Sequence, residues 1–148
     1  MSERALRGAA AVLAIAGAGV SSYLVYSHYA HVQVACTTGG CETVLNSKYA
    51  ELAGVPVAVL GLAAYAVLLV CALVPGELAA LAGAALSAAG LAFAIYLIVI
   101  QVAVLEALCQ WCLTSDGLLF LLTIACGWRF VRAARRPRAQ LEPRSSLS

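Results

Sequence analysis

The sequence predicts an all-α membrane protein, a four-transmembrane-helix bundle with a short surface half-helix in its first outer loop. Of the 148 residues, 64% are hydrophobic and only 11% are charged, whereas a water-soluble domain of this size needs far more polar surface. Four long apolar stretches follow one another along the chain. Lys48 is the one basic residue in the middle of the chain. The other basic residues lie near the two ends, and they are Arg4, Arg7, Arg129, Arg132, Arg135, Arg136, Arg138 and Arg144.

This charge distribution predicts the orientation of the chain. Short segments rich in Lys and Arg stay on the cytoplasmic side of a membrane, so both termini are expected there and the number of spans is even. A basic tail after a last span is an ordinary topology signal. We therefore expect no nucleic-acid partner.

The first span is expected over about residues 8–26, a length that suits a hydrocarbon core of roughly 30 Å. A basic start and an apolar run are also features of a signal peptide. The run is long for that purpose, however, and it ends in Tyr23, Tyr26 and Tyr29, which suit a membrane interface. The sequence therefore favours an uncleaved span.

The other three spans are expected at about residues 57–74, 78–105 and 109–127. Pro75-Gly76-Glu77 predicts a tight cytoplasmic turn between the second span and the third. The third span is longer than a crossing needs, which indicates tilt, and its small residues allow close helix packing.

The basic tail, residues 135–148, combines arginines, prolines and serines and is expected to be disordered. Residues 1–134 then form one membrane domain. The sequence shows neither an internal repeat nor a second domain.

The first outer loop, residues 27–55, carries Cys36 and Cys41 with two glycines between them. The glycines let the backbone turn, so the two cysteines can approach and separate.

After these cysteines, Leu45, Tyr49 and Leu52 recur at i, i+4 and i+7. This spacing predicts a short amphipathic helix over 42–52 that lies on the membrane surface. Gly54 is expected to end it.

A second cysteine pair, Cys109-Gln110-Trp111-Cys112, opens the fourth span. A helix N-terminus stabilises a thiolate, and a thiolate is the form that attacks disulfides and electrophiles. The predicted topology puts Cys36, Cys41, Cys109 and Cys112 on the same, outer side of the membrane.

Two cysteine pairs on one side can form a relay, because a thiolate of one pair attacks the disulfide of the other. The loop pair is accessible to a soluble protein, and the CxxC pair to a lipid-soluble molecule. A membrane quinone, menaquinone or ubiquinone, accepts the two electrons that a dithiol releases. The pattern thus predicts a link between a water-phase dithiol and a quinone.

Other residues are candidates for a part in this chemistry. Asp116 lies one helical turn below Cys112 and shares its face, and a carboxylate at membrane depth tends to face a cavity. It could protonate or hydrogen-bond a quinone, or bond to a neighbouring helix. Tyr65 is a candidate quinone contact, although packing is the favoured role for it. Cys71 and Cys126 lie toward the cytoplasmic side and are expected to be packing residues.

Two other classes of function stay open at this point. The four outer cysteines, with or without His31, could form a thiolate metal site such as a zinc site, although the spacing of Cys36 and Cys41 is unlike a usual metal knuckle. The chain could also be a structural membrane subunit with two inert disulfides. We expect no metal site, because stable metal thiolates are uncommon on an oxidising face.

The chain resembles a bacterial member of the vitamin K epoxide reductase family from about Tyr23 to Gly127. The resemblance rests on Cys36 and Cys41 in the outer loop, on Ser47 six residues past the second of them, and on the later CxxC. Further features agree with it, namely Gly54-Val55-Pro56, Gly61 and Tyr65.

The resemblance implies a four-helix bundle around a quinone, in the bacterial inner membrane. By that resemblance Cys109 and Cys112 reduce the quinone, with Cys112 against its ring. Cys109 exchanges with Cys41, and Cys36 exchanges with a separate thioredoxin-like, DsbA-type partner. Ser47 matches a pocket hydroxyl of the family.

The animal enzyme's quinone-binding tyrosine aligns with Asp116 here, which favours plain quinone reduction over epoxide reduction.

Overall fold

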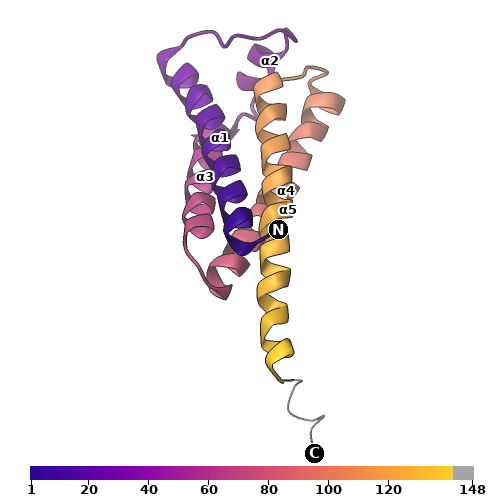
Figure 1. Cartoon of the computed structure of the whole chain (residues 1–148). Coiled ribbons are helices and arrows are strands. Elements are labelled where there is room, and N and C mark those ends of the chain that lie inside the picture. The colour runs from indigo at the N-terminus through magenta and orange to yellow at the C-terminus, as the bar shows by residue number, and fades with distance from the viewer. Residues whose placement is uncertain (142–148) are drawn as a thin grey trace, which may run out of the picture.

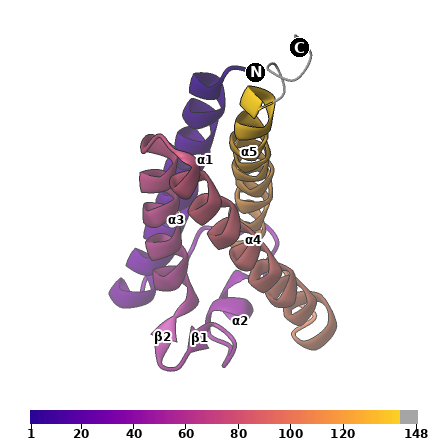
Figure 2. The ribbon, with the colours of Figure 1, turned by 90° about the horizontal axis from the view of Figure 1, so that it is seen from below.

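The computed structural model describes the backbone of residues 1–141 and the side chains of residues 1–136. Four long helices make up most of it: α1 (Glu3–Ala30), α3 (Val57–Leu73), α4 (Glu77–Val99) and α5 (Gln110–Leu141) (Figure 1). α1 packs against α3 and α5, and α4 packs against α5 and α3. Viewed along the bundle, α4 is inclined to the other helices (Figure 2).

The short elements gather at one end of the bundle (Figures 1 and 2). They are helix α2 (Cys41–Leu45), strands β1 (Glu51–Leu52) and β2 (Val55–Pro56), and a π-helical turn η1 (Ile100–Val104) that continues α4.

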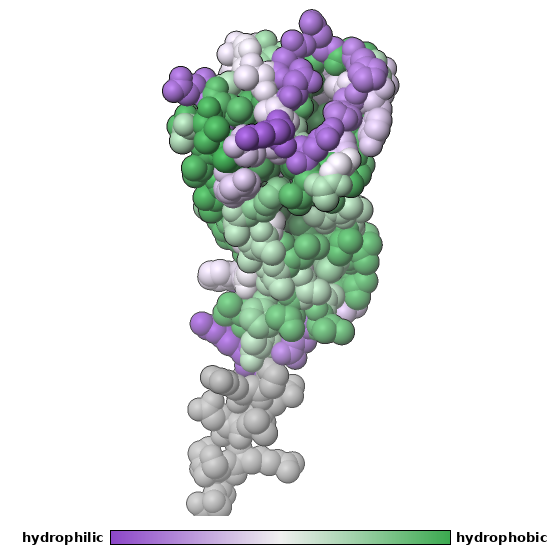
Figure 3. All heavy atoms as spheres, turned by 180° about the vertical axis from the view of Figure 1, so that it is seen from behind, coloured by the Kyte–Doolittle hydropathy of each residue, from purple (hydrophilic) through white to green (hydrophobic). Residues whose placement is uncertain are grey.

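Within the described residues, three helices are long and apolar enough to cross a membrane: α1, α4 continued through η1, and α5. α3 is also apolar but has only 17 residues. Figure 3 shows a hydrophobic belt between a hydrophilic cap, formed at the end that carries the loop, and hydrophilic side chains near the opposite end. The predicted helical membrane fold is confirmed at this level, and each predicted span overlaps one of the four long helices.

The ends of two helices differ from the predicted limits. α1 begins at Glu3, where the Ser2 hydroxyl accepts a hydrogen bond from the Ala5 N–H and caps the helix. α5 continues to Leu141 and so includes the beginning of the tail predicted to be disordered from Arg135. Residues 142–148 of that tail lie outside the described residues.

Small residues bring α1 and α3 into close contact. Ala10 and Ala14 of α1 are fully buried, and they share a core with Tyr65 and Leu68 of α3. A Cβ atom added at Gly17 would lie 2.2 Å from the Tyr65 ring, so only glycine fits there. The sequence of α1 thus fixes where the Tyr65 ring can lie.

The predicted amphipathic helix over 42–52 is shorter in the structure and ends at Leu45. The Ser47 side chain and backbone N–H both donate to the Val44 carbonyl, which closes a turn in place of further helix. Glu51–Leu52 is a strand that pairs antiparallel with Val55–Pro56. The two residues between the strands, Ala53 and Gly54, both have positive φ, as a tight hairpin turn requires.

At the end of the bundle opposite the loop, arginines bind the C-terminal carbonyls of α3. Arg129 is only 1% exposed; it donates to the Cys71 and Val74 carbonyls and forms an ion pair with Glu3 at 3.2 Å. Arg7 donates to the carbonyls of Ala72 and Leu73. Carbonyls at a helix C-terminus have no partner within the helix, so these two arginines satisfy groups that lipid could not.

Candidate functional site

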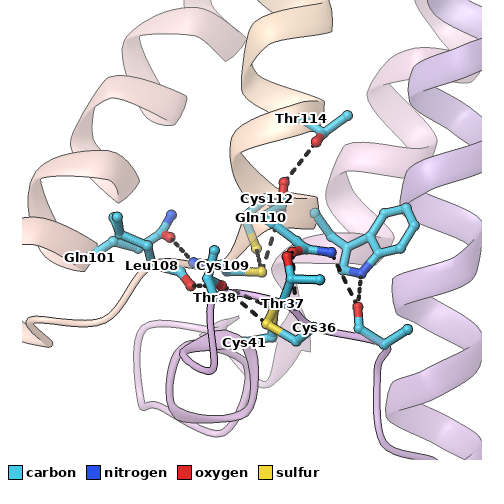
Figure 4. Close-up of a disulfide and its surroundings, with 12 residues drawn as sticks. Cys36, Thr37, Thr38, Cys41, Gln101, Leu108, Cys109, Gln110, Cys112 and Thr114 are labelled. Atoms are coloured by element: carbon cyan, nitrogen blue, oxygen red, sulfur yellow. Dashed lines mark hydrogen bonds between the residues drawn. A yellow bond between two sulfur atoms is a disulfide. The ribbon is translucent and has the colours of Figure 1, made fainter.

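The four cysteines singled out in the sequence come together beside the loop end of α5 (Figure 4). Cys36 and Cys41 form a disulfide, and Cys109 and Cys112 are free thiols. Cys41 and Cys109 are fully buried in one apolar cluster, against which Cys36 and Cys112 pack. The structure therefore combines one oxidised and one reduced pair in a single cluster.

Cys109 occupies the N-cap position of α5. Its carbonyl accepts the Leu113 N–H, and its Sγ accepts the Cys112 N–H at 3.4 Å. The Cys112 thiol also donates to Cys109 Sγ, with the two sulfurs 2.7 Å apart. This thiol donor, with the backbone N–H groups of the helix start, outweighs burial and lowers the pKa of Cys109 to about 7. Cys109 is thus the thiol of the pair that ionises first.

Gln101 holds the backbone of Cys109 in place. Its Oε1 accepts the Cys109 N–H at 2.9 Å, and its own carbonyl accepts the Ala107 N–H. This role of Gln101 was not predicted from the sequence. One signal could have found it: the interior face of α4 carries Ala80, Ser87 and Ala94 at intervals of seven, and Gln101 continues that series.

Gln110 and Trp111, the residues between the two cysteines, fasten the outer loop to α5. The Gln110 Oε1 accepts hydrogen bonds from the Thr37 N–H and hydroxyl. The Trp111 Nε1 donates to the Ala35 carbonyl at 2.6 Å, and its ring packs 4.9 Å from that of Tyr23. The motif therefore positions the loop that carries Cys36 as well as the CxxC pair.

Thr38 and Gly40 set the approach between the two cysteine pairs. The Thr38 hydroxyl lies 3.1 Å from Cys36 Sγ and donates to the Leu108 carbonyl at 2.8 Å. A Cβ atom at Gly40 would lie 2.7 Å from both the N and the O of Leu108. Because Gly40 precedes Cys41 and Leu108 precedes Cys109, this contact places the two buried cysteines beside each other.

A cavity of about 600 Å³ lies on the other side of Cys112. Residues of α1, the outer loop, α2, α3, α4, η1 and α5 contribute to its mostly apolar wall. Cys112 is part of this wall and Cys109 is not. Cys112 thus faces the cavity, whereas Cys109 lies between Cys112 and the loop disulfide.

The three residues predicted from the sequence as cofactor contacts, Ser47, Tyr65 and Asp116, all line this cavity. Tyr65 donates its hydroxyl to the Ser115 carbonyl at 2.7 Å, and Ser47 donates to the Val44 carbonyl. Asp116 Oδ2 is buried and has no hydrogen-bond partner among the described residues. An unpartnered buried oxygen is costly, so the carboxyl group of this cavity-lining residue needs a further explanation.

Within the described residues, no three His, Cys, Asp or Glu side chains are grouped as a metal ion would require. His31 ends α1 in a left-handed conformation, and His28 lies 3.9 Å from Glu51 across the loop.

The four cysteines of the site can perform thiol and disulfide chemistry next to a mostly apolar cavity. Comparison with known protein families agrees with that chemistry: the model of the vitamin K epoxide reductase family matches residues 9–126.

Proposed function

The chain belongs to the vitamin K epoxide reductase family, whose members are membrane thiol oxidoreductases, and we propose that it is a quinone reductase that generates protein disulfides. Electrons pass from a thioredoxin-like, DsbA-type partner to Cys36 and Cys41, then to Cys109 and Cys112, and finally to a membrane quinone. The observation that carries the proposal is the position of Cys112 in the cavity wall, with Cys109 between it and the buried Cys41.

The partner enters the cycle at the loop disulfide. Cys36 is partly exposed and Cys41 is fully buried, so a partner thiolate reaches the sulfur of Cys36 first. Exchange through a mixed disulfide then leaves the partner oxidised and both loop cysteines as thiols. Two electrons and two protons enter the protein in this step.

Internal transfer follows when the CxxC pair is a disulfide. The Cys41 thiolate attacks the sulfur of Cys109, and Cys112 leaves as a thiolate next to the cavity. The Cys36 thiolate then attacks Cys41 and releases Cys109 as a thiolate, which restores the loop disulfide. Of the two protons that Cys41 and Cys36 lose on becoming thiolates, one passes to Cys112 and the other protonates Asp116. The outcome is a loop disulfide with a CxxC dithiol, the same distribution that the structure has.

The cavity fits a quinone head group. Its wall is mostly apolar, its volume is about 600 Å³, and one of its lining residues is Asp116, whose Oδ2 is buried without a partner among the described residues. A bound quinone, menaquinone or ubiquinone, would take up two electrons and two protons from this site. Ser47, Tyr65 and Asp116 would hold it against Cys112.

Asp116 has a proton to supply in this reaction. With Cys109 held as a thiolate at the N-cap, the dithiol carries both electrons but only the proton on Cys112. The reduced quinone needs a second proton, and the unpartnered Asp116 carboxyl borders the same cavity. We assign this proton to Asp116.

The membrane arrangement belongs to the same proposal. All four long helices cross the bacterial inner membrane, with both termini cytoplasmic and the four reactive cysteines outside. α3 is about 25 Å long at 1.5 Å per residue, slightly shorter than a bilayer core. Arg7 and Arg129 complete its C-terminal carbonyls, which lets a helix of this length end near the cytoplasmic interface.

The test follows quinone absorbance with the purified protein, a reduced thioredoxin-like donor and either quinone. Wild type should consume the quinone, and Cys112→Ala should not. Cys71→Ala removes a free cysteine at the opposite end of the bundle and should turn over like wild type. A wild-type protein that reduces neither quinone with several donors would refute the proposal.

A further inference from the structure

Gln101 is an amide in an otherwise apolar stretch of the chain, residues 97–105. It is 2% exposed, lies in the π-helical turn η1, and contributes to the wall of the cavity that contains Cys112. π-helical turns occur often at functional sites. A buried amide in an apolar segment is costly unless both of its ends are used.

One end of the Gln101 amide has a fixed partner. The Cys109 N–H is a donor, so the oxygen of the amide must face it, as the 2.9 Å bond shows. This choice fixes the orientation of the amide and directs its nitrogen away from Cys109 (Figure 4). The orientation therefore follows from the hydrogen bond.

The nitrogen end is open. Within residues 1–136, the bond from Cys109 is the only hydrogen bond of the Gln101 side chain. A fully enclosed Nε2 would then be a buried atom without a partner, yet Asp116 Oδ2 is the only such atom among the described residues. Gln101 Nε2 must therefore retain some accessible surface, and the cavity that Gln101 lines is what it can reach.

We propose that Gln101 connects the two halves of the site: its Oε1 positions Cys109, and its Nε2 donates a hydrogen bond to a carbonyl oxygen of the bound quinone. The inference rests on the proposed function, since it takes the quinone as the ligand of the cavity. Quinone carbonyls are acceptors and Nε2 is a donor, so the pairing matches.

A consequence is that ligand binding and thiol geometry are coupled. A quinone bonded to Nε2 restrains the amide, and the restrained amide restrains the Cys109 N–H. Cys109 then stays at the N-cap, where its sulfur accepts from Cys112. Bound quinone therefore favours the state in which Cys109 is a thiolate and Cys112 carries the proton.

The experiment measures two quantities on Gln101→Met, which keeps the length of the side chain and removes both polar ends. The first is the Kd of a short-chain quinone in detergent, followed by quenching of tryptophan fluorescence. The second is the pH dependence of Cys109 alkylation in a Cys112→Ser background. Loss of one hydrogen bond predicts a Kd raised by about tenfold. The pH midpoint for alkylation should also rise relative to the Cys112→Ser protein that keeps Gln101, because Cys109 is no longer held at the N-cap.

Two further variants separate positioning from general damage. Gln101→Glu keeps an oxygen for the Cys109 N–H but loses the Nε2 donor, so it should raise the quinone Kd as Gln101→Met does. Thr123→Val removes a hydroxyl group that bonds the Ser87 and Leu119 carbonyls and does not line the cavity, and it should leave the quinone Kd unchanged. A folded Gln101→Met protein with the quinone Kd of wild type would overturn the inference. A wild type that binds no quinone would instead refute the proposed function.

Discussion

Gly40→Ala tests whether contact between the outer loop and α5 controls electron transfer. The new Cβ would lie 2.7 Å from Leu108 N and O and 3.2 Å from Ala107 C, whereas ordinary contacts begin near 3.4 Å. All three are backbone atoms, so no side chain can rotate away. The loop must retreat by about 0.7 Å, the difference between 3.4 and 2.7 Å.

This displacement acts where Cys41 must meet Cys109. Misplacing reacting groups by about 1 Å can cost on the order of 100-fold in rate, so we expect transfer between the pairs to slow by about 10- to 100-fold. Overpacking should also lower the free energy of unfolding by about 1–3 kcal/mol. Reduction of the quinone by an already reduced CxxC pair should stay close to wild type, because the cavity is not altered.

The assay uses a Cys36→Ser, Cys112→Ser background, in which Cys41 and Cys109 are the only outer thiols. Mild oxidation should cross-link them, and a maleimide-induced shift in gel mobility measures the rate. Gly39→Asn is the matched control: Gly39 has φ of 75°, which asparagine tolerates, and no atom lies within 4 Å of its Cβ position. Cross-linking of a folded Gly40→Ala protein at the control rate would refute the reasoning.

Three further predictions concern single residues. Because the pKa of Cys109 is lowered to about 7, its alkylation in protein that keeps Cys112 should be slow at pH 6 and near its maximum at pH 8. Mass spectrometry should then give a midpoint close to pH 7. A midpoint near 9 would contradict the stabilisation of the Cys109 thiolate at the N-cap. Asp116→Asn should slow quinone reduction and change its pH dependence. In the Cys36→Ser, Cys112→Ser background it should leave the rate of Cys41–Cys109 cross-linking unchanged. An unchanged pH profile of quinone reduction would contradict the proton-donor role. Arg129→Met should lower the free energy of unfolding in detergent by about 3 kcal/mol, whereas Arg135→Met, at an exposed position, should leave it nearly unchanged.

Much of the helical fold could be predicted from the sequence because lipid imposes a simple rule on the chain. Every stretch that crosses a membrane must be apolar and must satisfy its own backbone, so long apolar runs are helices. The segment after Cys41 follows no such rule. Leu45, Tyr49 and Leu52 keep a helical interval, but the Ser47 turn and the positive φ of Ala53 and Gly54 end the helix early and form a hairpin. Local side-chain bonds of this kind outweigh periodicity in short segments.

In the candidate site, too, some residues could be predicted from the sequence and others could not. Asp116, Ser47 and Tyr65 could be predicted as cavity residues because spacing from Cys112 or likeness to a family placed them there, and all three line the cavity. Gln101 was missed because its role depends on one backbone N–H eight residues further along the chain. Arg129 was interpreted only as a topology signal, because nothing in its neighbours shows that it lies against the end of α3.

The two sulfurs of the CxxC pair face different partners, and this difference gives the proposed relay its direction. The helix start and the Cys112 thiol stabilise Cys109 as a thiolate, which favours its release from Cys41 when Cys36 restores the loop disulfide. Cys112 gains no comparable donor and instead borders the cavity. A loop thiolate that attacks the CxxC disulfide meets Cys109 first, because the Gly40 contact and the apolar cluster present that sulfur. Each such attack leaves the freed thiolate on Cys112, next to the bound acceptor.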